Sequence, residues 1–382
     1  RSGRGRHGRD AQDGDQKVKI LIATNHSYML YRFRRELIEA LMREHEVILS
    51  MPFVGHEDDF KAMGLRCIDT KLDRRSVDPV KDIRLVKAYR AMLDEIAPDI
   101  VITYSIKPNI YMGSACKARG IPYFTNVQGL GTAFEKPVLS SVVTAMYRGA
   151  LSRAEKVFFE NTENANFFTE RKIVSPERVC VLPGAGINLA EYPYLPMRDD
   201  GVCSFLFLGR IMKEKGCDEF FAAARALKNE LGSKVEFDVV GFYEDAYKEM
   251  VDQLVSDGII KFHGFQTNVH PYYEAADCVV LPSYHEGMSN VLLEGAATGR
   301  ALITSDIPGC REAVEDGVGG YLCRVRDAEG LTAAMRTFAL SSFERQAQMG
   351  RSAREHVERE FDKQTVVAKT LEYIGCGTAV RV

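Results

Sequence analysis

The chain has 382 residues, a formal net charge of −3, 46% hydrophobic residues and 27% charged residues. This length exceeds what one ordinary hydrophobic core organises, so we expect two domains of a soluble globular protein. The negative net charge argues against nucleic-acid binding driven by bulk charge. The sequence also lacks a run of the roughly 18 apolar residues that a membrane span needs.

The start of the chain and its cysteines indicate where the protein works. Residues 1–16 are polar and lack the apolar core of a signal peptide, so we expect a disordered leader there. The nine cysteines are scattered and form no C-x-x-C pair. This pattern argues against disulfides and structural zinc, and it favours a cytoplasmic location.

Strand and helix patterns alternate through the first half of the chain. Residues 17–23 form a short apolar run rich in β-branched residues, which predicts a buried strand, and residues 31–43 carry helical periodicity. Further strands are predicted at residues 46–50, 99–103, 121–125, 156–160 and 178–182. This alternation is typical of a doubly wound parallel sheet.

A second strand series follows a linker around residues 191–201, which contains two prolines and ends in Gly201. Its strands are predicted at residues 204–208, 235–240, 259–262, 278–281 and 301–304. The fold class is therefore α/β, with two Rossmann-like domains, 17–195 and 196–360, facing each other across a cleft. The helical tail 361–374 either closes the second domain or packs back on the first.

Residues 281–309 read as a strand end, a turn, a helix and a second strand with its turn. The helix is predicted to begin near Ser289. Its free N–H groups and the positive end of its dipole favour an anion, most often a phosphate. Glu286 lies in the turn, and Glu294 lies eight positions later on a small, apolar helix. A carboxylate there needs a partner, which is either a structural cation or solvent, or the hydroxyl groups of a ligand.

Two cations follow the first strand of the second half. Arg210 and Lys215 come after that strand's carboxyl end, next to Gly209 and Gly216, which let a ligand approach the backbone. A guanidinium and an ammonium group at this place suit a diphosphate, although Lys and Arg are also common in solvated loops.

Together, these motifs resemble the family 4 (group 1) retaining glycosyltransferases of the GT-B fold. The resemblance rests on Gly-Arg-x4-Lys-Gly, followed 71 residues after Lys215 by Glu-x7-Glu. Two further segments match in order and spacing, 181–188 (VLPGAGIN) and 264–273 (GFQTNVHPYY). The resemblance covers nearly the whole chain from residue 17 onward.

The resemblance implies a role for each matching residue. The donor would be a nucleotide sugar, for which we expect a UDP-sugar, bound mainly to the second domain. Arg210 and Lys215 would hold its diphosphate beside Gly209, and Glu286 would hold its sugar; these two cations and Glu286 are the predicted catalytic residues. Glu294 would bind the ribose hydroxyls. The amides of Gly287, Met288 and Ser289 would complete the donor site.

The first half resembles a bacterial subgroup that extends polyprenyl-diphosphate-linked sugars in surface polysaccharide or glycan synthesis. The matching segments are 103–111 (TYSIKPNIY) and 126–134 (NVQGLGTAF). Two positions depart from the family: residues 25–27 replace a glycine pair after the first strand, and a histidine near the fifth strand is replaced by Asn126 and Gln128. The expected acceptor-side residues are His26, Lys107, Asn126 and Gln128.

The resemblance also implies that the anomeric configuration is retained. Because no Asp-x-Asp stands at a strand end, we expect neither a metal ion nor another cofactor. A nucleotide-sugar epimerase of the same shape is the alternative enzyme. A dinucleotide oxidoreductase would need Gly-x-Gly-x-x-Gly after the first strand, which is absent.

Peripheral contact with an anionic membrane is expected from the lipid-linked acceptor. Arg32, Arg34, Arg35 and Lys107 are predicted to face the acceptor diphosphate or anionic lipid. Residues 135–156 form an apolar stripe with basic neighbours. Such a helix either lies on a bilayer or packs as the core face of a Rossmann-like domain.

Overall fold

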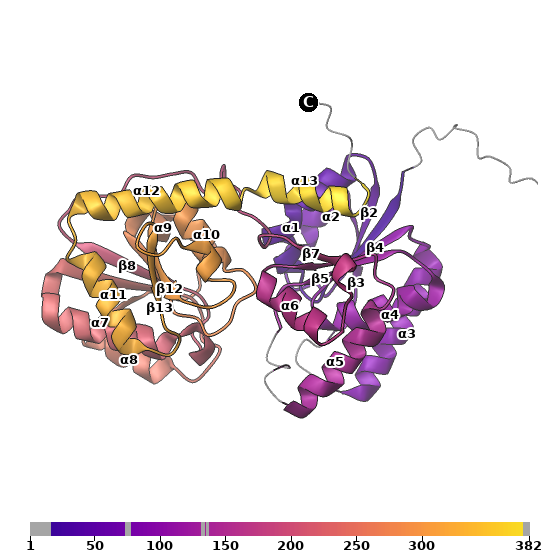
Figure 1. The fold of residues 1–382 in the computed structure, drawn as a ribbon, viewed down its shortest axis with the longest axis horizontal. Helices are drawn as coiled ribbons and strands as arrows, with labels where there is room; N and C mark the ends of the chain where they lie inside the picture. The colour runs from indigo at the N-terminus through magenta and orange to yellow at the C-terminus, as the bar shows by residue number, and fades with distance from the viewer. Residues whose placement is uncertain (1–16, 73–77, 131–133, 135–136, 377–382) are drawn as a thin grey trace, which may run out of the picture.

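The computed structural model describes residues 17–72, 78–130, 134 and 137–376. The expected leader 1–16 lies outside the described residues, as do residues 131–133 and 135–136 of the predicted segments. Two α/β domains lie side by side, each built on its own parallel sheet (Figure 1). The predicted fold class is confirmed.

The N-terminal domain contains a seven-stranded sheet in its described part, ordered β3-β2-β1-β4-β5-β6-β7. All of its strand pairs are parallel. The strands are β1 (Lys19–Ala23), β2 (Glu46–Met51), β3 (Arg66–Asp69), β4 (Ile100–Tyr104), β5 (Tyr123–Val127), β6 (Lys156–Phe159) and β7 (Val179–Val181). The helices that connect them are α1 (Ser27–Met42), α2 (Glu57–Ala62), α3 (Pro79–Ile96), α4 (Ile106–Arg119), α5 (Pro137–Leu151) and α6 (Thr162–Glu170).

The C-terminal domain repeats this plan with a six-stranded parallel sheet, ordered β10-β9-β8-β11-β12-β13. Its strands are β8 (Cys203–Leu208), β9 (Val235–Val240), β10 (Lys261–Phe262), β11 (Cys278–Leu281), β12 (Ala301–Ser305) and β13 (Gly320–Cys323). Its helices are α7 (Cys217–Leu231), α8 (Lys248–Ser256), α9 (His270–Ala275), α10 (Asn290–Ala297), α11 (Ala328–Ala339) and α12 (Phe343–Glu360). The order reverses at β8 and β11, where ligands of open α/β sheets bind.

β3, β13 and α3 are among the elements that the sequence analysis did not predict. β3 is a short edge strand without a continuous apolar run, and β13 is an edge strand of four residues. α3 begins after Asp78, whose side chain accepts hydrogen bonds from the Val80 and Lys81 amides, with Pro79 at its first position. This cap and proline are ordinary start signals of a helix and could have predicted α3.

The C-terminal tail joins the two domains. α12 lies over the C-terminal domain and α13 (Lys363–Tyr373) lies over the N-terminal domain (Figure 1). Val367 and Ile374 are buried in the same apolar cluster as residues of α1. Lys363 lies 3.6 Å from the Glu36 carboxylate, which is also on α1. The tail therefore packs back on the first domain.

The amphipathic stripe predicted at residues 135–156 forms α5 and packs inward. Val143, Tyr147 and Ala150 are buried in the N-terminal core, whereas Val142 on the same helix is 51% exposed. The stripe is thus a core face, the second of the two alternatives. None of the described helices combines the length and apolarity that crossing a bilayer requires.

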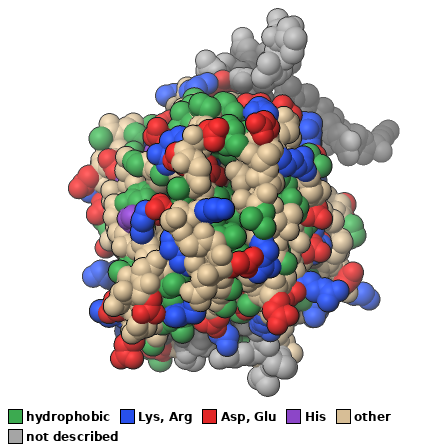
Figure 2. Space-filling view, turned by 90° about the vertical axis from the view of Figure 1, so that its left-hand side faces the viewer, with side chains coloured by type: hydrophobic (Ala, Val, Ile, Leu, Met, Phe, Trp, Pro, Cys, Tyr) green, Lys and Arg blue, Asp and Glu red, His purple; other side chains and the backbone are tan. Residues whose placement is uncertain are grey.

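The outer end of the C-terminal domain has no surface dominated by one charge. Figure 2 shows this face, on which Lys and Arg side chains alternate with Asp and Glu side chains and with scattered hydrophobic groups. Opposite charges placed so close together cancel at a distance. This face therefore offers no extended basic surface to an anionic partner.

Candidate active site

The turn before α10 packs directly on the N-terminal domain. Gly287 lies so close to the end of β5 that an added Cβ would overlap the Gln128 carbonyl oxygen and lie 2.6 Å from Oε2 of Glu160. The side-chain amide of Asn161 donates to the Gly287 carbonyl over 2.8 Å. Strand ends of the first sheet thus contact the helix start of the second, as expected for a site between two such domains.

Lys215 and Glu286 meet at this helix start. Nζ of Lys215 donates to Oε1 of Glu286, and the hydroxyl of Ser283 donates to the same oxygen over 2.8 Å. Both charged side chains are mostly buried, at 18% and 13% exposure. Ser289 caps α10 by accepting from the Leu292 amide, so the helix begins as predicted.

Arg210 lies at the same edge but is less constrained. Its side chain is 42% exposed, and Nη1 lies 3.8 Å from the Glu244 carboxylate. An exposed pair at this distance contributes little, so the guanidinium can turn toward a ligand at small cost. Gly209 continues the sheet, since its amide donates to the Val240 carbonyl over 2.9 Å.

Glu294 is buried and has the partners that its position requires. The Tyr273 hydroxyl donates to Oε2 over 2.8 Å, and Nη2 of Arg32 from the first domain lies 3.9 Å from Oε1. Burial raises the pKa of the Glu294 carboxyl, while the Tyr273 hydrogen bond and the Arg32 charge lower it. The ribose-binding role stays a prediction, and it would add a ligand to a carboxylate that already has protein partners.

Glu160 is a buried carboxylate at the site that the sequence analysis missed. It follows β6, and Nη2 of Arg34 donates to its Oε1 over 2.9 Å. Burial raises the pKa of Glu160 to about 7, against the lowering effects of Arg34, the Met288 amide and the Gln128 side chain. The sequence signal was the Glu-Asn pair directly after the apolar run of residues 157–159.

The predicted acceptor-side residues separate into different places. Gln128 lies at the domain junction, with its side chain 3.5 Å from the Met29 sulfur. Asn126 is buried inside the sheet, where its amide donates to the Thr103 carbonyl over 3.3 Å. His26 directly precedes α1. Lys107 lines a cavity beside α3, and its Nζ donates to the Asp82 carboxylate over 2.8 Å.

The prediction that Arg34 faces the acceptor or lipid is wrong, because the residue is 6% exposed and pairs with Glu160. Arg32 lies 3.3 Å from Glu191 in the linker, and Arg35 lies 3.7 Å from the same residue. Glu191 of the linker and Glu160, which follows β6, therefore pair with all three guanidinium groups. Of the three, Arg32 also reaches the C-terminal domain, since its Nη2 lies 3.9 Å from Oε1 of Glu294.

The two facing Rossmann-like domains, with a cation and a carboxylate at the start of α10, define the class of GT-B glycosyltransferases. Two family models match the chain: "Glycosyl transferase 4-like" over residues 18–161 and "Glycosyl transferases group 1" over residues 203–340. Together they span most of both domains. The chain belongs to the group 1 glycosyltransferases.

Two curated relatives act on lipid-linked sugars by name. N,N'-diacetylbacillosaminyl-diphospho-undecaprenol alpha-1,3-N-acetylgalactosaminyltransferase of Campylobacter jejuni is 26% identical over 79% of this chain and 84% of its own length. UDP-Gal:alpha-D-GlcNAc-diphosphoundecaprenol alpha-1,3-galactosyltransferase of Escherichia coli is 25% identical over 68% of this chain and 71% of its own length. Among solved structures, Anabaena HepE in complex with UDP and glucose superposes with a TM-score of 0.76 at 16% identity, over 94% of this chain and 99% of HepE, and so supports the fold.

We predict that Gly287→Ala lowers both the melting temperature and kcat/KM, the latter by roughly tenfold, because the new methyl group forces the α10 turn away from Gln128 and Glu160. Thermal unfolding and steady-state kinetics measure the two effects. Gly149→Ala is the control, since an added Cβ there meets open space. Wild-type values for Gly287→Ala would show that the close approach is not needed.

We predict that Glu160→Gln changes how stability depends on pH. Because the folded pKa of Glu160 is raised to about 7, its stabilising contribution is present at low pH and is lost as the pH rises through about 7. Glutamine resembles the protonated form at every pH. The free energy of unfolding of the variant should therefore rise relative to wild type between pH 5 and pH 8, measured by urea titration. The exposed Glu170→Gln is the control, and a constant difference would contradict the raised pKa.

Proposed function

We propose that this protein is a retaining glycosyltransferase that moves a sugar from a nucleotide sugar, a UDP-sugar, to a lipid-linked saccharide. The observation that supports it best is the meeting of Lys215 and Glu286 at the start of α10, with the exposed Arg210 at the same sheet edge. A cation pair and a helix N-terminus suit a diphosphate, and a nearby carboxylate suits sugar hydroxyls. Both matched family models describe glycosyltransferases, which favours transfer over the epimerase alternative.

Lys215 and Arg210 act on the leaving group in this proposal. When the bond between the sugar and the diphosphate breaks, negative charge grows on the bridging oxygen. Lys215 exchanges the Glu286 carboxylate for phosphate oxygens, and Arg210 turns from Glu244 toward the same group. Preorganised cations and the α10 dipole stabilise that charge by several kcal/mol without a metal ion. Glu286, released from Lys215, then accepts hydrogen bonds from the donor sugar.

Retention follows if the acceptor hydroxyl attacks from the face that the diphosphate leaves. The departing phosphate oxygen then takes the acceptor proton, so the step needs no separate base. In this proposal the N-terminal domain binds the acceptor. The names of the Campylobacter and Escherichia relatives support an undecaprenyl-diphosphate-linked acceptor. Such an acceptor would bring the first domain to the cytoplasmic surface of the membrane.

The wild-type protein tests this proposal directly. With a panel of UDP-sugars and a polyprenyl-diphosphate-linked saccharide, we expect transfer with the anomeric configuration of the donor, read by proton NMR of the product. Excess chelator should leave the rate nearly unchanged, because the protein's own cations face the diphosphate. Inversion would contradict the retaining mechanism, and complete loss restored by magnesium would contradict metal independence. Conversion of the nucleotide sugar alone into its epimer would favour the alternative enzyme.

We predict that Lys215→Ala lowers kcat by roughly tenfold or more, because the leaving diphosphate loses a charge that balances it. Lys213→Ala is a matched control, since this exposed lysine lies two residues earlier in the same short 3-10 helix. Steady-state kinetics at saturating donor measures both. If the two variants lose activity equally, the effect belongs to the helix and not to the Lys215 charge.

A further inference from the structure

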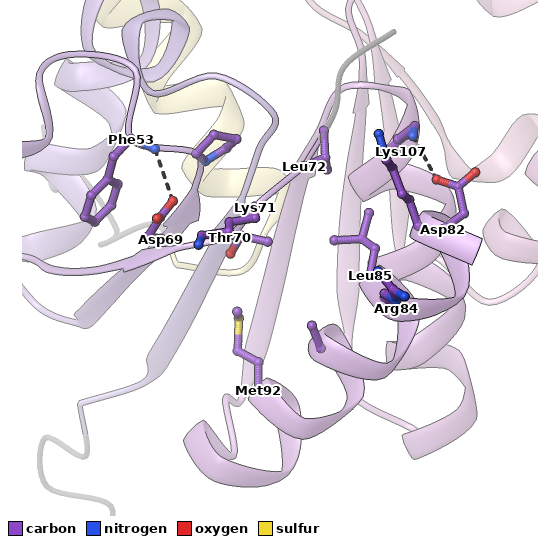
Figure 3. A pocket seen from close by; sticks show the side chains of 13 residues that line it. Phe53, Asp69, Thr70, Lys71, Leu72, Asp82, Arg84, Leu85, Met92 and Lys107 are labelled. Atoms are coloured by element: carbon purple, nitrogen blue, oxygen red, sulfur yellow. Dashed lines mark hydrogen bonds and ion pairs between the residues drawn. The ribbon is translucent and has the colours of Figure 1, made fainter. Parts of the chain in front are cut away.

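A cavity opens on the N-terminal domain, away from the α10 turn. It has a volume of about 810 Å³, which is ordinary for a small-molecule site. It lies among the residues that follow β2 and β3, one side of α3 and the first turn of α4 (Figure 3). It is lined by Pro52, Phe53, Asp69, Thr70, Lys71, Leu72, Lys81, Asp82, Arg84, Leu85, Ala88, Met92 and Lys107.

The cavity has a charged end and an apolar end. Lys107 and Asp82 form an ion pair of 2.8 Å near one end, and Met92 lies at the other (Figure 3). From Asp82 to Met92, α3 advances about 15 Å at its ordinary rise per residue. Leu85 and Ala88 lie between them, so the helix presents apolar groups to the cavity beyond its charged end.

Among the described residues that line this cavity, cations outnumber carboxylates. Its walls carry Lys71, Lys81, Arg84 and Lys107 against Asp69 and Asp82. The Asp82 carboxylate already accepts from Lys107 and from the Tyr111 hydroxyl over 2.8 Å. Lys71 and Arg84 are exposed. In Figure 3, Arg84 lies beside Leu85 on α3 and Lys71 lies on the opposite wall beside Thr70, so the cations face the cavity from two sides and can hold an anion with more than one negative charge.

We infer that this cavity binds the prenyl diphosphate part of the acceptor, with the diphosphate among Lys71, Arg84 and Lys107 and the first isoprene units along Leu85, Ala88 and Met92. This inference rests on the proposed function and assigns a binding site to the acceptor. The ligand is a diphosphate that carries an apolar chain, since either part alone would leave half of the lining unused. An anionic phospholipid head group would share the charged end only.

The position of the charged end suits transfer. Lys107 follows β4, and Gln128, which contacts Gly287 of the donor turn, follows β5. These strands are neighbours, and neighbouring strands lie about 4.8 Å apart. A diphosphate near Lys107 would thus lie along the same sheet edge as the transfer site, with the attached saccharide reaching toward Gly287. The apolar end leads away from that edge.

Geranyl diphosphate tests the inference without a transfer assay. Calorimetry on the whole chain, with saturating UDP to occupy the donor site, should show binding that inorganic diphosphate matches only weakly. Arg84→Glu together with Lys71→Glu should weaken geranyl diphosphate binding by roughly tenfold or more. Ala88→Trp fills the apolar end and should weaken geranyl diphosphate but not inorganic diphosphate. Lys87→Glu is the matched control, since it makes the same charge change on an exposed α3 residue outside the lining.

Each result supports or overturns the inference. Loss in the cavity variants with full binding in Lys87→Glu supports it. An equal loss of geranyl diphosphate binding in Lys87→Glu overturns it, because the binding would then arise from non-specific electrostatic attraction. Loss of binding to phosphatidylglycerol vesicles in these variants, with no binding of geranyl diphosphate to wild type, overturns it in favour of a lipid surface. If lipid-linked transfer proceeds at the wild-type rate in Arg84→Glu, the cavity inference fails and the proposed function stands; if wild type transfers no sugar from any donor, the function itself fails.

Discussion

The arrangement of the two domains depends on one close contact, between Gly287 and the carboxyl ends of β5 and β6. No other residue type fits between the α10 turn and the Gln128 carbonyl oxygen. This contact places the start of a helix, with its positive dipole, against strand ends of the opposite sheet. Lys215 and Glu286 are held at the same point, so the geometry of the site is set by the backbone as much as by the charges.

The close contact between the domains also buries two carboxylates, which costs desolvation free energy. Glu160 and Glu294 are both removed from water, and each accepts hydrogen bonds from groups that reduce that cost. The cations that face them, Arg34 and Arg32, both come from α1 of the first domain. A buried pair of this kind is weak support for stability, but losing one partner is expensive. The Arg32–Glu294 pair joins the two domains, whereas the Arg34–Glu160 pair lies within the first domain and holds the carboxylate that accepts from the Met288 amide of the second.

Much of the fold could be predicted because strands buried on both faces read as apolar runs. β3 and α3, which were not predicted, lack such an apolar run. β3 is an edge strand, and the sequence signals for α3 are its Asp78 cap and Pro79 more than its periodicity. The meeting of Lys215 with Glu286 at the start of α10 could be predicted because these residues follow one another at fixed spacing around a helix start. Glu160 could not be recognised in the same way, since its role arises from contact with Met288 of the other domain, 128 positions later in the chain.

The arginines of α1 show why charge alone does not locate a ligand. From the sequence they are a basic cluster after the first strand, and a basic cluster suggests an anion. In the folded chain, Glu160 after β6, Glu191 of the linker and Glu294 of α10 lie close to these arginines, so the charge of the arginines is already balanced by the protein. The cavity beside α3 differs because the cations among its described lining residues outnumber the carboxylates. Whether cations are balanced by carboxylates is decided by contacts between distant parts of the chain, so a basic cluster in the sequence does not by itself locate a ligand.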